Sequence, residues 1–159
     1  MADTDQPVAA YQKILDRLYD NATYSAQAYF EAAKGAEFLG KVIVFLPALM
    51  AACAGALVAL DFSKAWGIAA AAAGLVSATG SFLGAERKAP SFRESARRYT
   101  QLRHKIASAA DLATFASVKD LAEIVKKLEV EYSEIVGRDE PVSNRYFNRA
   151  SRRVKRGKV

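Results

Sequence analysis

The sequence has very few residues of the kinds that build metal and redox sites. Its 159 residues include one cysteine, Cys53, and one histidine, His104. A single cysteine excludes an intramolecular disulfide and any metal site with several cysteine ligands. With no second histidine and no cysteine outside the apolar segments, His104 cannot belong to a His/Cys metal cluster or a Cys–His pair. Cys53 lies in an apolar segment, where we expect an unreactive packing residue.

The sequence also lacks the motifs of nucleotide-binding and catalytic sites. It contains no GxxxxGK[ST] loop and no GxGxxG after a strand. The carboxylates between Glu123 and Glu131 alternate with lysines at helical spacings, which is typical of surface ion pairs. We therefore expect no enzyme activity, no metal and no cofactor.

Two segments are almost free of ionisable side chains. Residues 42–60 contain none apart from Cys53, and residues 65–85 contain none. Since a helix rises about 1.5 Å per residue, both segments can cross a bilayer core of about 30 Å. Only residues 61–64 separate them, which predicts an antiparallel transmembrane hairpin. The alternative is a soluble hairpin, but the remaining charged residues would struggle to cover two helices that are apolar all round.

The basic residues are distributed unevenly about these segments. Four Lys or Arg precede residue 42, Lys64 lies between the segments, and eighteen follow residue 85. By the positive-inside rule, this predicts a multi-pass protein of the inner (plasma) membrane with both termini cytoplasmic. The N-terminal MADTDQPVAA has no basic region and no apolar core, so we do not expect a signal peptide.

Three further stretches have the period of amphipathic helices. The first spans residues 8–38 and is expected to continue almost directly into the first apolar segment. A break near residues 114–117 separates the second from the third, and Gly137 is expected to cap the third. We expect the stripes to pack as a bundle beneath the membrane, although they would also support intermolecular packing. The stripe residues are Tyr11, Leu15, Leu18, Ala22, Ala26, Tyr29 and Ala33, then Phe92, Ala96, Tyr99, Leu102, Ile106 and Ala109, then Leu121, Ile124, Val125, Leu128, Tyr132 and Ile135.

The predicted fold class is an all-α membrane protein with four segments. Residues 1–41 form a cytoplasmic amphipathic helix, 42–85 the transmembrane hairpin (42–60 and 65–85), 86–140 cytoplasmic helices and 141–159 a basic tail. The tail is expected to be solvated and attracted to anionic lipid, with a phosphate ligand as the alternative and nucleic acid not expected. The cations proposed for these contacts are Arg87, Lys88, Arg152, Arg153, Lys155 and Arg156.

Small residues recur at four-residue spacing in both apolar segments. Such spacing lets helix backbones approach closely in lipid. It predicts a tight hairpin and a homo-oligomer, while packing within the hairpin alone is the alternative. The candidate packing residues are Ala48, Ala52, Gly55, Ala56, Gly74, Gly80 and Gly84.

Hydroxyl groups interrupt the second apolar segment at Ser77, Thr79 and Ser81. In an assembly of several hairpins they could line an aqueous path. Alternatively, they return hydrogen bonds to carbonyls of their own helix. The apolar segments hold no charged residue, so an ion-relay transporter or voltage sensor has no support.

Several stretches together resemble the SLATT domain family over nearly the whole chain. They are YQKILDRLYDNATYSAQAYFEAA, FRESARRYTQLRHKIASAADLATF, EYSEIV and RYFNRA, placed around the two apolar segments. The resemblance implies a membrane effector of a bacterial anti-phage nucleotide-signalling system. Such an effector would oligomerise and permeabilise the inner membrane in response to a cyclic nucleotide or a nucleotide-signalling enzyme. The alternative is a non-toxic membrane scaffold that tethers a cytoplasmic partner.

Overall fold

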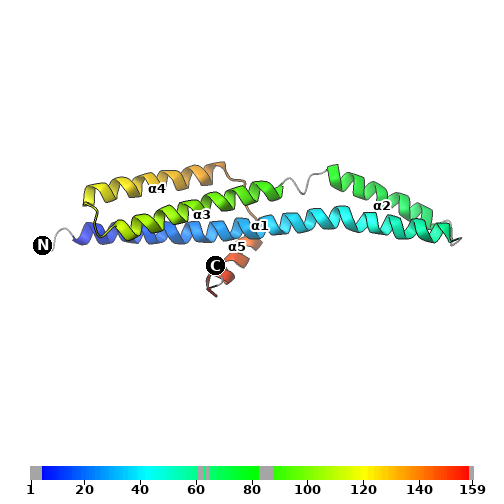
Figure 1. Cartoon of the computed structure of the whole chain (residues 1–159), viewed down its shortest axis with the longest axis horizontal. Helices are drawn as coiled ribbons and strands as arrows, with labels where there is room; N and C mark the ends of the chain where they lie inside the picture. Colours follow the sequence, from blue (N-terminus) through cyan, green and yellow to red (C-terminus); the bar gives the residue numbers. More distant parts are fainter. Residues whose placement is uncertain (1–4, 61–62, 64, 83–87, 158–159) are drawn as a thin grey trace. The chain divides into compact units, whose positions relative to one another are not determined.

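The computed structural model describes residues 5–60, 63, 65–82 and 88–157. Every element in this part of the chain is an α-helix, which confirms the all-α prediction (Figure 1). The helices are α1 Asp5–Ala59, α2 Ala65–Phe82, α3 Lys88–Leu112, α4 Val118–Arg138 and α5 Asn144–Val154. The chain divides into two compact units, one of Met1–Ala32 with Phe92–Val159 and one of Ala33–Ser91.

α1 joins the amphipathic stretch and the first apolar segment in one helix of 55 residues. This confirms the expectation that the two run together, because neither Gly35 nor Gly40 interrupts the helix. Pro47 lies inside α1. Proline has no N–H group, so the Ile43 carbonyl lacks its usual helical donor at this point. The second apolar segment is helical from Ala65 to Phe82, and residues 83–85 of the prediction lie outside the described residues.

The larger unit has an apolar core between the first part of α1, α3 and α4 (Figure 1). Its largest fully buried side chains are Leu15 from α1, Leu102 and Ile106 from α3, and Leu121 from α4. Burying each such side chain stabilises the fold by about 1.5–3 kcal/mol. The three predicted stripes are confirmed, since every one of their residues is buried or partly buried.

The α3–α4 connection falls at the predicted break, and its sequence explains where α4 begins. Ser117 is the N-cap residue, and its hydroxyl oxygen accepts a hydrogen bond from the Asp120 backbone N–H at 3.2 Å. The same hydroxyl donates to the Asp120 carboxylate at 2.7 Å. This reciprocal arrangement satisfies a donor at the start of the helix.

The predicted cap at Gly137 is wrong. Gly137 lies inside α4, which ends at Arg138 with Asp139 as the extended C-cap residue. Two contacts hold the chain that leaves the helix. The Ser95 hydroxyl donates to the Asp139 carboxylate at 2.7 Å, and the Tyr29 hydroxyl donates to the Glu140 carbonyl oxygen at 2.9 Å. Pro141 also disfavours a helical conformation at the residue before it.

The C-terminal segment is more ordered than the solvated tail that we expected. Residues Asn144–Val154 form α5, and Ala150 is fully buried within its unit. Arg153 of α5 forms an ion pair with Glu31 of α1. The exposed cations of this segment are Arg145, Arg149, Arg152, Lys155 and Arg156.

Candidate functional site

In the smaller unit, α2 contacts the apolar part of α1. The Ser77 hydroxyl of α2 donates a hydrogen bond to the Val44 carbonyl oxygen of α1 at 3.3 Å. Near the other end of α2, a Cβ built on Gly67 would lie 3.9 Å from a methyl group of Val58. The end of α2 therefore lies near the beginning of the apolar part of α1, and the beginning of α2 lies near the end of that part. The less exposed small residues here are Ala51, Ala54, Gly67, Ala70 and Ala73.

The predicted packing residues occupy other positions. Ala48, Ala52, Gly55 and Ala56 of α1 and Gly74 of α2 are exposed. A Cβ added at Gly55 or Gly74 would meet nothing within 4 Å. Gly80 lies in α2 but its surroundings, like all of Gly84, fall outside the described residues. These small residues are therefore accessible to lipid or to a second chain, and their role in oligomerisation stays a prediction.

The three hydroxyl residues of the second apolar segment differ in their contacts. Ser77 bonds across to α1, as described above. Thr79 returns a hydrogen bond to the Leu75 carbonyl of its own helix at 2.8 Å. Ser81 lies in α2, and its side chain is outside the described part. A pore-lining role for these residues stays a prediction.

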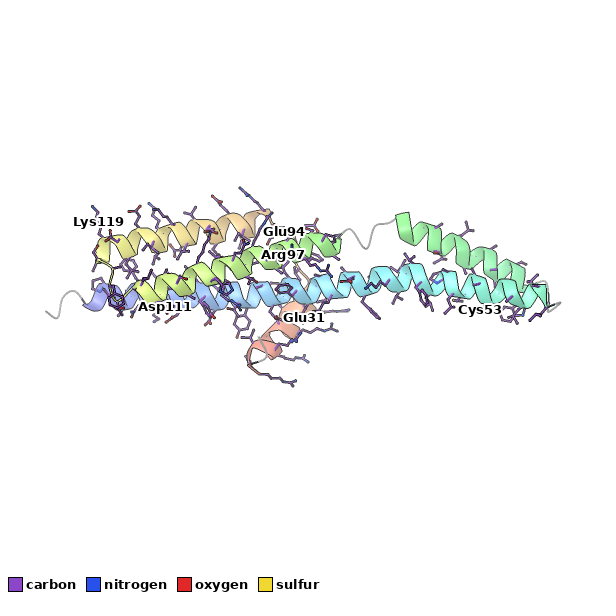
Figure 2. The ribbon with its side chains drawn as sticks, in the orientation of Figure 1. Glu31, Cys53, Glu94, Arg97, Asp111 and Lys119 are labelled. Atoms are coloured by element: carbon purple, nitrogen blue, oxygen red, sulfur yellow. The ribbon has the colours of Figure 1, made fainter. Side chains whose placement is uncertain are left out.

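The apolar part of α1 is long and exposed. Within the described residues, α1 is the helix that is long and apolar enough to cross a membrane, and the apolar stretch of α2, Ala65–Thr79, is shorter. Only 6% of the most apolar 18-residue window of α1 is buried. A core helix of a soluble protein would be mostly buried instead. Cys53 is exposed on this helix (Figure 2), so it is not packed within the chain as we expected.

The basic residues proposed for lipid or phosphate contact fall into two groups. Arg152, Lys155 and Arg156 are exposed, whereas Arg153 contacts Glu31, which Figure 2 shows on α1. Lys88 is an exposed residue at the start of α3, and Arg87 lies outside the described residues.

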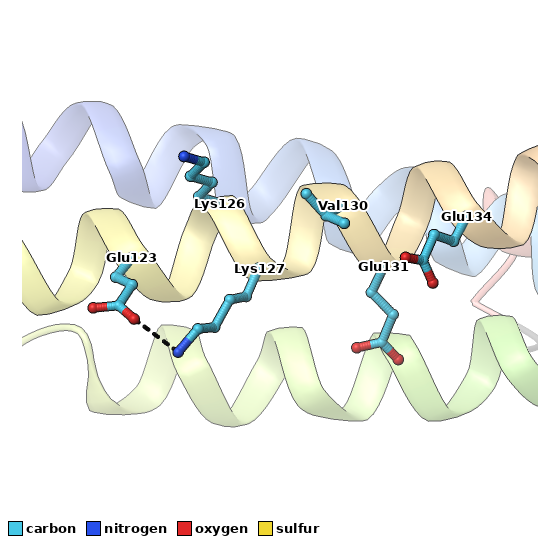
Figure 3. A pocket seen from close by; sticks show the side chains of 6 residues that line it. All are labelled: Glu123, Lys126, Lys127, Val130, Glu131 and Glu134. Carbon is cyan, nitrogen blue, oxygen red and sulfur yellow. Dashed lines mark ion pairs between the residues drawn. The ribbon is translucent and has the colours of Figure 1, made fainter.

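A shallow groove on α4 carries charges of both signs (Figure 3). Lys127 pairs with Glu123 at 2.9 Å, which confirms the predicted ion pairing. Glu131 pairs with Lys105 of α3 at 2.7 Å. His104 is exposed on α3, and the described residues contain no group of three His, Cys, Asp or Glu side chains placed to hold a metal ion. The groove is a shallow, charged face of α4.

A cavity of about 450 Å³ lies in the larger unit and was not predicted from the sequence. We call it the tyrosine cavity. It is lined by Asn21, Tyr24, Ser25 and Tyr29 of α1, Tyr99 of α3, Tyr132 and Val136 of α4, Asp139, Pro141 and Val142 of the following segment, and Phe147 of α5. The only sequence signal is the helical spacing of Tyr29, Tyr99 and Tyr132, which predicts core positions for these three residues.

Tyr29 and Tyr99, two of the four tyrosines of this cavity, are strongly shielded from water. Tyr29 and Tyr99 stack with ring centroids 5.5 Å apart, and Tyr132 meets Tyr99 edge-on at 6.1 Å. Burial, with the nearby Asp139 and Glu140 charges, raises the pKa of Tyr29 to about 12. Burial and the Asp139 carboxylate raise the pKa of Tyr99 as well. Both hydroxyls are therefore neutral at physiological pH.

The resemblance to the SLATT family depends on the order of the helices and the placement of aromatic residues, and it has no independent support from relatives. The chain matches no protein-family model, no curated protein and no solved structure.

Proposed function

We propose that the chain is an integral membrane protein in which α2 and the apolar part of α1 cross the bilayer as a hairpin. The observation that carries this proposal is the exposure of the apolar helices, because only 6% of the most apolar window of α1 is buried and the rest would otherwise face water. α2 has 18 residues and a length of about 27 Å, close to the thickness of a bilayer core. The larger unit, rich in Lys and Arg, then lies in the cytoplasm.

The Ser77–Val44 contact supports the same arrangement. In lipid no water competes for a backbone carbonyl, so the Ser77 hydroxyl is a favourable second donor to the Val44 carbonyl. The bond joins α2 to the turn of α1 that precedes Pro47. Two apolar helices connected in this way insert as one unit, which helps the alanine-rich α2 to enter the bilayer.

The sole cysteine makes this topology directly testable. In a Cys53→Ala background, Ser63→Cys should react with a membrane-impermeant maleimide added to intact cells, since Ser63 lies between the two helices. Thr114→Cys, in the exposed α3–α4 turn, should react only after the cells are permeabilised. Native Cys53 should stay unlabelled until detergent is added. Labelling of Thr114→Cys in intact cells, or release of the protein by alkaline carbonate, would contradict the proposal.

We further propose that the protein acts as an effector that oligomerises and permeabilises the bacterial inner membrane. Support comes from small residues that stay exposed after α1 and α2 have packed together, namely Ala48, Ala52, Gly55, Ala56 and Gly74. In lipid such residues allow close contact with helices of other copies. The SLATT resemblance implies that permeabilisation is triggered by a cyclic nucleotide or by a nucleotide-signalling enzyme.

The variants Gly55→Leu and Gly74→Leu test oligomerisation without disturbing the fold of the single chain. A side chain at either position meets nothing within 4 Å in the chain, so the single chain should fold normally. Both variants should reduce self-crosslinking and dye entry into expressing cells. Gly137→Leu, equally unobstructed but on α4, is the matched control. Undiminished crosslinking and dye entry in both glycine variants would refute the effector mechanism.

A non-toxic scaffold is the second candidate function. Exposed apolar side chains on the larger unit favour it, notably Phe115 at 88% and Val130 at 52% exposure. Here expression should leave dye exclusion intact, and crosslinking should recover a different protein instead of copies of the same chain. Phe115→Ser should then reduce recovery of that protein.

A further inference from the structure

The tyrosine cavity contains the carboxylate of Asp139, whose two oxygens differ in their contacts. One carboxylate oxygen of Asp139, Oδ1, accepts the hydrogen bond from Ser95 at 2.7 Å. The other, Oδ2, is buried without a donor of standard hydrogen-bond geometry among the described residues, and the Tyr99 hydroxyl interacts with the same carboxylate, which helps to raise the pKa of Tyr99. A buried acceptor without a donor costs about 1–3 kcal/mol, and a charged one costs more. Native structures rarely keep such a group without a ligand, an ion or a functional role.

The walls around this oxygen favour a cation. Among the described residues that line the cavity, Asp139 alone carries a full charge. Five aromatic rings surround the same space. They belong to Tyr24, Tyr29, Tyr99, Tyr132 and Phe147. The faces of such rings attract ammonium and guanidinium groups electrostatically. An anion would instead meet the carboxylate and apolar surface.

The cavity is also organised before any ligand arrives. The Tyr29 hydroxyl is engaged by the Glu140 carbonyl, and the Tyr29 and Tyr99 rings stack on each other. The Ser95 hydroxyl fixes the Asp139 carboxylate. Rigid walls lower the entropy cost of binding a small molecule. The volume, about 450 Å³, is in the usual range for small-molecule sites.

We propose that the tyrosine cavity binds a small organic ammonium compound whose N–H group donates to the Asp139 carboxylate and whose charge lies against the tyrosine rings. This site is separate from the apolar helices, so the proposal does not depend on a membrane-permeabilising activity. It restricts the ligand to a protonated amine with at least one N–H, since a quaternary ammonium has no N–H to give the carboxylate.

Calorimetric titration of the full chain in detergent micelles tests the proposal. The probes are n-butylammonium, which has N–H donors, and tetramethylammonium, which has none. n-Butylammonium should bind saturably and at least about tenfold more tightly than tetramethylammonium, the worth of one charge-assisted hydrogen bond. Equal binding of the two probes, or no saturable binding of n-butylammonium, would overturn the proposal.

Two variants locate the site. Asp139→Asn keeps an acceptor for Ser95 but removes the charge, and it should weaken n-butylammonium binding at least about tenfold. Phe147→Ala removes one ring from a side chain that is already 39% exposed, so the fold should survive, and binding should fall about threefold or more. Glu129→Gln removes an exposed carboxylate from α4 and serves as the matched control with unchanged binding. Unchanged binding in Phe147→Ala would place the ligand elsewhere and overturn the assignment, even if Asp139→Asn failed to fold.

A free amine and a lipid headgroup share the same ammonium chemistry. Adding phosphatidylethanolamine to the micelles distinguishes them. Competition with n-butylammonium would identify the headgroup as the source, and absence of competition would identify a free amine. Either result supports the ammonium site only if Phe147→Ala also weakens binding.

Discussion

The Ser77 hydroxyl of α2 donates a hydrogen bond to the Val44 carbonyl oxygen of α1, with 3.3 Å between the two oxygens. Val44 lies three residues before Pro47, in the turn where the backbone ladder of α1 is interrupted. The bond therefore links the two apolar helices in the turn of α1 that precedes Pro47, one residue from the Ile43 carbonyl that loses its helical donor.

Ser77→Ala should weaken the association of α1 and α2. Interhelical hydrogen bonds in membranes contribute about 0.6–2 kcal/mol, so a loss of that size is expected. Thr79→Ala is the matched control, because the Thr79 hydroxyl bonds within its own helix. The measurement is the reversible unfolding of the full chain in mixed micelles, followed by Trp66 fluorescence in α2. Equal losses in the two variants would show that the bond to Val44 contributes nothing specific.

Leu102→Ala should strongly destabilise the core of the larger unit. Leu102 is fully buried between α1, α3 and α4, and truncating such a side chain costs about 2–5 kcal/mol in transfer energy and cavity formation. Leu112 lies on the same helix but is 61% exposed, so Leu112→Ala should change stability by less than about 0.5 kcal/mol. Denaturant titration followed by tyrosine near-UV circular dichroism compares them. A loss below about 1 kcal/mol for Leu102→Ala would contradict the packing described.

The helical period of the sequence was sufficient to predict this core. Leu15, Leu102 and Leu121 lie on stripes with spacings of three and four, and such stripes must be buried to stabilise a helix in water. The period identifies the buried face without any knowledge of the partner. The short α3–α4 connection makes these two helices antiparallel neighbours, so it identifies α3 and α4 as packing partners.

Other features were not predictable because they depend on tertiary contacts. In α5, charged side chains predominate, and the helix is supported by burial of Ala150 and by the contact of Arg153 with Glu31, 122 residues away in sequence. Gly137 could end a helix, but the contacts of Asp139 and Glu140 decide where α4 stops. Several small faces on α1 had equal spacing, and sequence alone could not choose Ala51 and Ala54 over Ala52 and Ala56.

The tyrosine cavity was missed for a related reason. Its walls come from segments that are far apart in the chain, and Tyr29 meets the Glu140 carbonyl across 111 residues. At helical spacing, each tyrosine was indistinguishable from an ordinary core residue. Nothing near Asp139 in the sequence marks it as the buried carboxylate. Only the fold brings this charge together with the rings.

Arg153→Ala should destabilise the packing of α5 by about 1 kcal/mol. Arg153 is 42% exposed, so solvent and salt screen its attraction to Glu31, which is 12% exposed. The loss should shrink as ionic strength rises. Arg152→Ala removes the same charge from an exposed neighbour and should have little effect on stability. Limited proteolysis of the C-terminal segment provides the measurement, and equal protection in the two variants would show that the ion pair does not hold α5.

The buried tyrosines should make the larger unit sensitive to alkali. The pKa of Tyr29 is raised from 10.0 to about 12 by burial and by the Asp139 and Glu140 charges, so the folded state keeps this proton longer than the unfolded state does. A raised pKa contributes stability that is fully present below pH 10 and is lost as the pH rises through 12. Tyr29→Phe removes this titration, and the decline of stability between these pH values should be shallower, by up to about 1.4 kcal/mol per pH unit.

At neutral pH the same variant should be less stable than the wild type by about 1 kcal/mol, because the Glu140 carbonyl loses its donor. The two stability curves should therefore converge as the pH rises. Tyr19→Phe is the control, since Tyr19 is 38% exposed on α1. Denaturant titrations across the alkaline range measure both effects. Parallel curves for the wild type and Tyr29→Phe would mean that Tyr29 keeps an ordinary pKa, and the enclosed tyrosine environment described for the cavity would be wrong.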